Sequence, residues 1–106
     1  MSDMIRSLMG KVKSGLASLY GPRLRGVYLY GSYARDEADR ESDVDVLVVL
    51  DRVPHYAAEV EHTSHLISSL SLLSGVSISR VFVSEGDWAA RNTPFLVNVR
   101  DEAVSA

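Results

Sequence analysis

The sequence predicts a single α/β domain, spanning residues 1–106, in which a small mixed β-sheet packs against helices. Segments whose apolar residues recur every three or four positions, as in an amphipathic helix, alternate with short runs of valine, leucine and aromatic residues that are typical of buried strands. A chain of 106 residues is also too short to form two independent cores. We therefore expect the order helix, strand, short helix, strand, helix, strand and closing helical turns, an α/β sandwich.

The first amphipathic segment predicts a helix that ends near Tyr20. Its apolar residues form one stripe: Ile5, Leu8, Met9, Val12, Leu16, Leu19 and Tyr20. Gly21 and Pro22 supply the stop signal, because proline cannot continue a helix after a terminating glycine. Gly10 and Gly15 each weaken such a helix by about 1 kcal/mol relative to alanine.

Two strands are predicted at residues 24–30 and 44–50. The second is all valine and leucine after Asp45, which indicates burial on both faces. Between them, residues 33–38 have the composition of a short helix. The connection of about a dozen residues is close to the lower limit for a parallel crossover, so we expect a mixed sheet.

Apolar residues between Tyr56 and Leu73 predict a second long helix, which ends at Ser74 and Gly75. Its polar residues are expected to lie largely off the apolar stripe: His55, Glu59, Glu61 and His62. His62 and His65 are three residues apart and could share a metal, but a solvated helix face is the simpler interpretation.

A third strand is predicted at residues 76–83, followed by two helical turns broken at Pro94. Trp88, Phe95, Leu96 and Val99 are the apolar residues of these turns. We interpret Trp88 as an anchor of the core or of a partner interface rather than as a platform for base stacking.

Composition excludes several classes of function. The net charge of −3 argues against direct DNA binding, which needs clustered lysine and arginine. A nucleotide can still bind if a metal ion supplies the positive charge. The absence of cysteine excludes disulfides, thiolate metal sites and a cysteine nucleophile. No stretch approaches the roughly 20 apolar residues of a membrane span, so a cytoplasmic protein is the default expectation.

Gly31 and Ser32 stand where the first strand gives way to the following segment. At such a junction free backbone N–H groups can point at an anion. Gly31 would let a phosphate approach the backbone, and Ser32 would add a hydroxyl donor. Taken alone, this pair fits a plain turn with Ser32 as a helix N-cap at least as well.

Asp43 and Asp45 lie two residues apart at the start of the second strand. Their side chains therefore leave the same face, and their carboxylates can converge on one or two hard cations such as Mg²⁺. The alternative is a solvated, charged strand end. Two like charges on one face repel each other unless a cation lies between them, which favours the metal site.

The window YGSYARDEADRESDVDV, residues 30–46, closely resembles the signature of the minimal nucleotidyltransferases of the DNA polymerase beta-like superfamily. The pattern is G-S-x-A-R-(G)-x-x-x-x-x-S-D-x-D-(L), and the residues that match it are Gly31, Ser32, Ala34, Arg35, Ser42, Asp43 and Asp45. Asp36 stands where a glycine is usual, and Val46 where a leucine is usual. The tail PFLVNVRDEAV resembles the terminal helix of small members, with Ala103 in place of a glycine.

The resemblance implies a nucleotidyltransferase that uses two Mg²⁺ ions to transfer a nucleoside monophosphate, AMP from ATP, to an acceptor group. Asp43 and Asp45 would be the catalytic metal ligands, and Gly31 and Ser32 would hold the outgoing phosphates.

Arg35 and Ser42 complete the implied nucleotide-binding set. Arg35 could pair with a phosphate or an acidic acceptor, but a salt bridge to Asp43, Glu41 or Asp39 is an equal alternative. Ser42 is expected to shape the start of the strand rather than to react.

One departure from the family pattern weakens the catalytic expectation. Active members generally carry a third carboxylate on the next core strand, whereas residues 76–83 hold no acid. Ser77, Ser79 or Arg80 would face the aspartate pair instead. Glu85 and Asp87 lie just beyond the strand, where one could swing back, although first-turn helix positions explain both equally well.

Two functions therefore remain open. The first is an enzyme that adenylylates a protein or other acceptor, and small members of the family resemble the antitoxin of a pair whose toxin is a HEPN-domain ribonuclease. The second is a catalytically weak or inactive nucleotide-binding module that acts by binding a partner protein. A homodimer is a further open alternative, because so small a domain has only a modest core.

Overall fold

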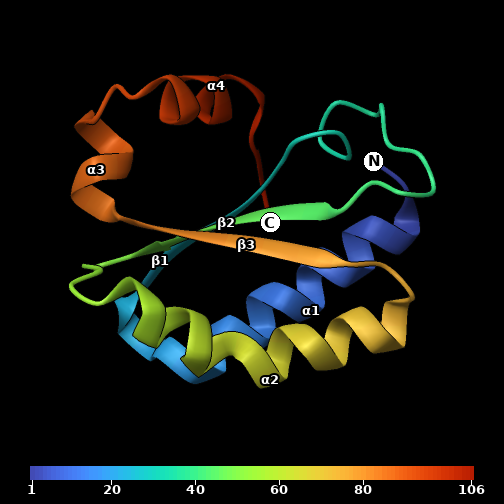
Figure 1. Ribbon diagram of the computed structural model, residues 1–106, viewed down its shortest axis with the longest axis horizontal. Coiled ribbons are helices and arrows are strands. Elements are labelled where there is room, and N and C mark those ends of the chain that lie inside the picture. The colour runs from blue at the N-terminus through green and yellow to red at the C-terminus, as the bar shows by residue number, and fades with distance from the viewer.

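The computed structural model describes residues 1–106 as one layered α/β unit (Figure 1). Its elements are α1 (Asp3–Tyr20), η1 (Gly21–Arg23), β1 (Leu24–Tyr30), β2 (Val44–Leu50), α2 (Tyr56–Ser74), β3 (Ile78–Ser84), α3 (Glu85–Ala90), α4 (Pro94–Glu102) and β4 (Val104–Ser105). The predicted fold class and the bounds of the first two strands are confirmed. The third strand starts two residues later than predicted, and it ends at Ser84.

The sheet has the order β3-β2-β1-β4 and is mixed, as the short connection predicted. β1 pairs with β2 antiparallel, and β2 pairs with β3 parallel through the crossover helix α2. The terminal strand β4, which pairs antiparallel with β1, was not predicted. It has only two residues, too few to show the alternation by which a strand is recognised in a sequence.

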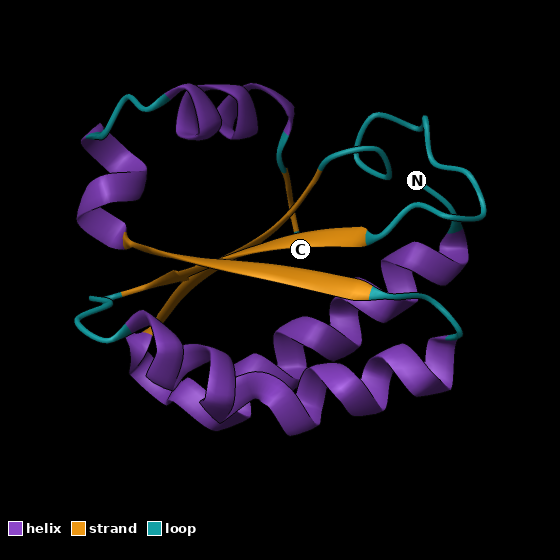
Figure 2. Ribbon diagram, in the orientation of Figure 1, coloured by secondary structure: helices purple, strands orange, loops and turns teal.

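Helices cover both faces of the sheet (Figure 2). α1 and α2 pack on one face over a core of 16 buried residues, and α4 packs on the other over the smaller cluster of Leu47, Val49 and Val99. β2 lies between these cores, and six of its seven residues are buried, in agreement with the two-sided burial predicted for it. No helix has both the length and the apolar character that a bilayer crossing requires.

The segment at residues 33–38 forms turns instead of the predicted short helix. Two of its turn bonds are donated by the Ala34 N–H to the Gly31 carbonyl, at 3.1 Å, and by the Glu37 N–H to the Ser32 carbonyl, at 2.9 Å. Asp36 has a φ of 56°, in the left-handed region, and this conformation interrupts a right-handed helix.

Glu59 is buried, contrary to its predicted position off the apolar stripe of α2, with only 8% of its surface exposed. The Tyr20 hydroxyl donates to Glu59 Oε1 at 3.0 Å, and Arg23 donates to Glu59 Oε2 at 3.3 Å. Burial and the neighbouring Glu59 carboxylate raise the pKa of the Tyr20 phenol. The carboxylate is tolerated inside because both of its oxygens have donors, and a sequence pattern does not reveal such partners.

The two mid-helix glycines of α1 have different surroundings. A Cβ at Gly10 would meet nothing within 4 Å, whereas a Cβ at Gly15 would clash with Leu66 of α2. Gly10 is therefore free to be replaced, and Gly15 lets the two helices approach closely.

We expect Gly10→Ala to raise the free energy of unfolding by about 0.5–1 kcal/mol, because alanine is the better helix former. Gly15→Ala should give no such gain, because the added methyl forces Leu66 to move. Urea denaturation of both variants tests this pair. Equal stabilisation by the two substitutions would show that the contact between α1 and α2 does not require Gly15.

Candidate active site

The segments that the sequence singled out meet at one end of the sheet. Because β1 and β2 are antiparallel, the end of β1 lies beside the start of β2, and Tyr30 pairs directly with Asp45. Gly31 and Ser32 follow β1 there, and Asp43 precedes β2 by one residue. The long loop between the two strands lies at this same end (Figure 1).

Gly31 and Asp45 lie so close together that no side chain fits between them. Gly31 has a φ of 76°, and a Cβ placed on it would overlap Oδ2 of Asp45. Glycine is required on both counts, since residues with a Cβ rarely adopt a positive φ. The turn backbone is therefore directly exposed to the Asp45 carboxylate.

The turn after β1 presents unused hydrogen-bond donors. The Gly31 carbonyl accepts from the N–H groups of Ala34 and Arg35, but the N–H groups of Ser32 and Tyr33 donate to no backbone carbonyl. Consecutive free N–H groups in a turn form a concavity that suits an anion. The segment is a turn, as the alternative interpretation expected, but no helix follows it, so the prediction that Ser32 acts as a helix N-cap is wrong.

Asp43 and Asp45 form a like-charged pair that a cation would relieve. Burial raises the pKa of Asp45, and the negative charge of Asp43 raises it further. Asp43 itself is exposed. No group of three or more histidine, cysteine or acidic side chains is arranged to hold a metal alone. The pair therefore fits a cation whose other ligands are water or phosphate oxygens, the arrangement that Mg²⁺ prefers.

The third strand brings a hydroxyl, not an acid, to this pair. Ser79 pairs with Asp45 in the parallel register, and the Ser77 carbonyl accepts from the Val44 N–H at 2.9 Å. The prediction that Arg80 could face the aspartates is wrong. Its guanidinium lies on the other face of the sheet, where it donates to Thr63 Oγ1 and to the Val60 carbonyl, both at 2.7 Å.

Glu85 and Asp87 do not swing back toward the aspartates. Both lie in the first turn of α3, at the opposite end of β3, and the Asp87 N–H donates to the capping Ser84 hydroxyl at 3.1 Å. Ser79 and Glu85 are six positions apart in the chain, a span of roughly 20 Å along an extended strand. Their first-turn position is the one in which a helix favours acidic residues.

Arg35 is engaged by acids that the sequence did not indicate. It donates to Glu102 Oε2 at 2.6 Å and to Glu37 Oε2 at 3.1 Å, so the expected salt bridges to Asp43, Glu41 or Asp39 are not formed. Ser42 lies, as expected, in the turn that leads into β2. Its hydroxyl accepts from the Asp39 N–H at 3.0 Å and donates to Asp39 Oδ1 at 3.2 Å.

Glu102, the last residue of α4, is the residue of this site that sequence reasoning missed. Its negative charge contributes to the raised pKa values of Asp45 and Tyr30. The pKa of Tyr30 reaches about 12, chiefly through burial and then through the Asp45 charge. The only signal in the sequence was the similarity of the tail to a family helix, and that similarity did not indicate which tail residue returns to the site.

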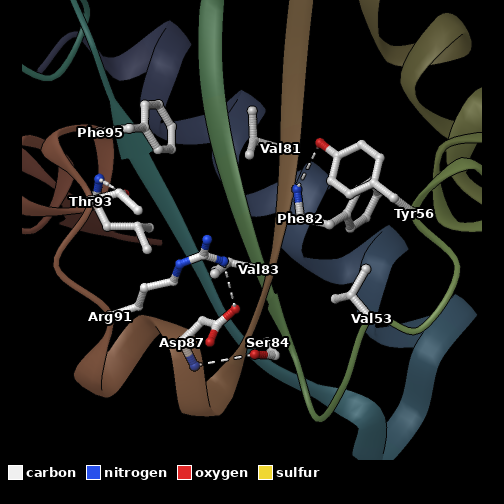
Figure 3. A pocket seen from close by; sticks show the side chains of 11 residues that line it. Val53, Tyr56, Val81, Phe82, Val83, Ser84, Asp87, Arg91, Thr93 and Phe95 are labelled. Atoms are coloured by element: carbon white, nitrogen blue, oxygen red, sulfur yellow. Dashed lines mark hydrogen bonds and ion pairs between the residues drawn. The ribbon is translucent and has the colours of Figure 1, made fainter.

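A cavity of about 370 Å³ lies along the outer edge of β3 (Figure 3). Val81 and Val83 of its lining are on the face of the aspartates, whereas Phe82 belongs to the core on the other face. We call this hollow the β3 cavity; its lining includes Tyr56, Val81, Val83, Thr93, Phe95 and Leu96. Trp88 does not line it. Trp88 packs on Tyr28, with a ring-centroid distance of 5.0 Å, and so serves as a core anchor, as predicted.

His62 and His65 line a separate hollow on the helical layer, formed with α1. The His62 ring packs edge-on against Tyr20, with a centroid distance of 5.2 Å. Both side chains are exposed, as expected for a solvated helix face.

Comparison with known proteins gives one consistent result. A family model described as a nucleotidyltransferase domain matches residues 9–93. A Methanocaldococcus jannaschii protein named "Putative protein adenylyltransferase" is 35% identical over 72 residues, which cover 68% of this chain and 66% of that protein. Protein adenylyltransferase MntA of Thermococcus cleftensis is 37% identical over 70 residues, which cover 66% of this chain and 69% of that protein.

Among solved structures, a toxin-antitoxin crystallised with AMP-PNP superposes with a TM-score of 0.64. It is 23% identical in sequence, and the match covers 92% of this chain and 70% of that one. At this level of identity the likeness establishes the fold. The chain spans just under two thirds of the Methanocaldococcus relative.

Asp36, where the family pattern has glycine, gives a test of the turn geometry. We expect Asp36→Gly to be more stable than Asp36→Ala by about 1 kcal/mol, because alanine in the left-handed region is strained. Both substitutions remove the exposed ion pair between Asp36 and the N-terminal amine, so its loss cancels in the comparison. Chemical denaturation measures the difference, and two equally stable variants would rule out a left-handed residue 36.

Asp45→Asn should stabilise the metal-free protein at pH 7 by a few tenths to about 1 kcal/mol, by removing a partly buried charge and its repulsion from Asp43. Because the folded-state pKa of Asp45 is raised, its protonated form favours folding, and that contribution is lost as the pH rises through the folded-state value. Asparagine mimics the protonated form. The advantage of the variant should therefore shrink toward acidic pH, which denaturation at a series of pH values would reveal. An advantage that is constant with pH contradicts this origin.

Proposed function

The chain belongs to the nucleotidyltransferase domain family, and from this premise we propose that it transfers AMP from ATP to a hydroxyl group of a partner protein. The observation that carries the proposal is the contact between the Gly31 turn and Asp45. It puts free backbone donors and a pair of carboxylates at one point, which is what a metal-bound triphosphate needs. The adenylyltransferase names of the two relatives support AMP as the transferred group.

Members of this family use a divalent metal ion, and we propose two Mg²⁺ ions held by Asp43 and Asp45. When bound, Mg²⁺ would neutralise charge on the phosphates and favour departure of pyrophosphate. The residues fit such ions because the two carboxylates are close in space and repel each other without a cation. Burial first, and then the charge of Asp43, raises the pKa of Asp45.

The turn after β1 would hold the β- and γ-phosphates. The N–H groups of Ser32 and Tyr33 are free to donate to them, and no hydrogen bond within the chain engages the Ser32 hydroxyl. Arg35 would add a charge at the rim of this turn, where 45% of its side chain is exposed. Ser42 would act indirectly, by fixing the turn that aims Asp43.

The transfer then needs an acceptor from another chain. The acceptor oxygen would bond to the α-phosphorus as the bond to the bridging oxygen breaks, and pyrophosphate would carry away the leaving electrons. β3 offers Ser79 and no carboxylate beside Asp45, so the acceptor proton would pass to water. The same absence favours the second candidate, a module that binds ATP and its partner with little or no transfer.

We propose that the partner is a HEPN-domain toxin and that this chain is a single-domain, cytoplasmic antitoxin. The structural similarity to a toxin-antitoxin supports this assignment. Leu72 and Leu73 of α2 are each 82% exposed and leave an apolar surface for such a partner or for a second copy of the chain.

The decisive experiment mixes the protein with α-labelled ATP, Mg²⁺ and the protein encoded by the neighbouring gene. We expect label on the partner. Asp43→Ala and Asp45→Ala should each lower the rate of labelling on the order of 100-fold or more, the scale for removing a group that stabilises a reacting centre. Asp101→Ala, an exposed acid of α4, is the matched control and should retain transfer.

Transfer that survives both aspartate substitutions would contradict the catalytic assignment. Calorimetry separates the two candidates if no label appears. Mg²⁺-dependent ATP binding without transfer supports the binding module, whereas no ATP binding at all removes both candidates.

A further inference from the structure

The β3 cavity lies along the outer edge of β3, and its wall of Val81 and Val83 is on the same face of the sheet as the aspartate pair. Ser79 pairs with Asp45, Val81 with Leu47, and Val83 with Val49. Side chains alternate along a strand, so Val81 and Val83 share the face of Ser79. Two residues of strand span roughly 7 Å, so the cavity begins about one ribose away from the aspartate pair.

The order of the strands gives a bound triphosphate a direction. The phosphate turn follows β1, the aspartates lie on β2, and the cavity lies on β3. A triphosphate held by both groups would have its β- and γ-phosphates over the end of β1 and its α-phosphate over β2. The nucleoside can then continue across the sheet toward β3, where the surface is hollowed.

The lining of the cavity matches an aromatic ligand. Phe95 is 43% exposed and forms a T-shaped pair with Tyr30, with a centroid distance of 5.6 Å, so part of its side chain remains open to a ligand. Figure 3 shows Phe95 and Val81 at one end and the ion pair of Asp87 and Arg91 at the other. Binding sites for small aromatic molecules combine such apolar walls with a few polar groups.

The cavity is also preformed. The Tyr56 hydroxyl accepts a hydrogen bond from the Phe82 N–H at 3.3 Å, and the Tyr56 ring packs edge-on against Phe82. Thr93 caps α4 by accepting from the Leu96 N–H at 3.2 Å. These contacts fix two walls without any ligand, which lowers the entropic cost of binding.

We propose that the β3 cavity binds the base of the nucleoside triphosphate, with Phe95 as the surface on which the base stacks. This inference rests on the proposed function, because it presumes that the phosphates lie at the Gly31 turn. The hollow lined by His62 and His65 is larger, at about 440 Å³, but it lies on the helical layer behind the sheet and cannot receive a base from that turn.

The test compares two probes in the presence of Mg²⁺: ATP, and tripolyphosphate, which has no base. By calorimetry, ATP should bind at least about tenfold more tightly than tripolyphosphate. Phe95→Ala should weaken ATP binding about tenfold, the scale for loss of one stacking aromatic, and should leave tripolyphosphate binding unchanged. Val97→Ala, a substitution of an exposed residue of α4 that does not line the cavity, should alter neither affinity.

A second measurement needs no variant. The methyl resonances of Val81 and Val83 should shift when ATP is added, through the ring current of the base, and should not shift with tripolyphosphate. The methyl resonances of Leu73 serve as the reference that stays in place with both probes.

Two results would overturn the proposal and leave the proposed function standing. Phe95→Ala could weaken the binding of ATP and of tripolyphosphate equally, which would mean that Phe95 affects only phosphate binding at the Gly31 turn. Alternatively, ATP affinity could be unchanged while transfer to the partner is lost, which would assign the cavity to the acceptor. If neither probe binds the wild-type protein, the proposed function fails together with this inference.

Discussion

The candidate site depends on the antiparallel pairing of β1 with β2, in the register that sets Tyr30 opposite Asp45. This pairing brings the end of one strand and the start of the next to the same place. A shift of one residue would turn the carboxylate of Asp45 into the core below the sheet. The register is held from both sides, because β2 alternates between two buried clusters. The buried apolar residues of β2, which contact no ligand, therefore fix the position of Asp45.

Sequence reasoning succeeded where a local pattern decides the structure and failed where distant partners do. The strands at 24–30 and 44–50 are continuous apolar runs, and the Gly31 and Asp45 positions are part of one short motif. Glu59 could not be placed, because its burial depends on Tyr20 and Arg23, which are remote in sequence. Glu102 was missed for the same reason, since a terminal helix must fold back before its last residue meets Arg35. The helix predicted at 33–38 is not formed, and the positive φ of Asp36 is the backbone angle that interrupts it.

Charge at this end of the molecule is unevenly compensated. Arg35 forms hydrogen bonds to Glu37 and Glu102, whereas Asp43 and Asp45 form no ion pair and Asp45 experiences the Arg35 charge only at longer range. A protein with a net charge of −3 thus keeps this like-charged pair where an open turn backbone offers donors to an anion. A metal ion bound to phosphates would bring positive charge to the aspartate pair and negative oxygens to the N–H groups of the turn. One ligand would thus satisfy both parts of the site.

The family model matches the chain up to residue 93, just before α4 begins. Gly31, Asp43 and Asp45 lie within the segment common to the family, whereas Phe95 and Glu102 lie on α4, beyond it. The helix that follows the common core thus supplies one wall of the β3 cavity and the acid that holds Arg35. Exposed residues of that helix, such as Phe95, can change without disturbing the strand pairing behind the aspartates, whereas its buried Val99 packs on β2. Related proteins could therefore select different ligands and still keep the same Gly31 turn and the same aspartate pair for binding phosphate and metal.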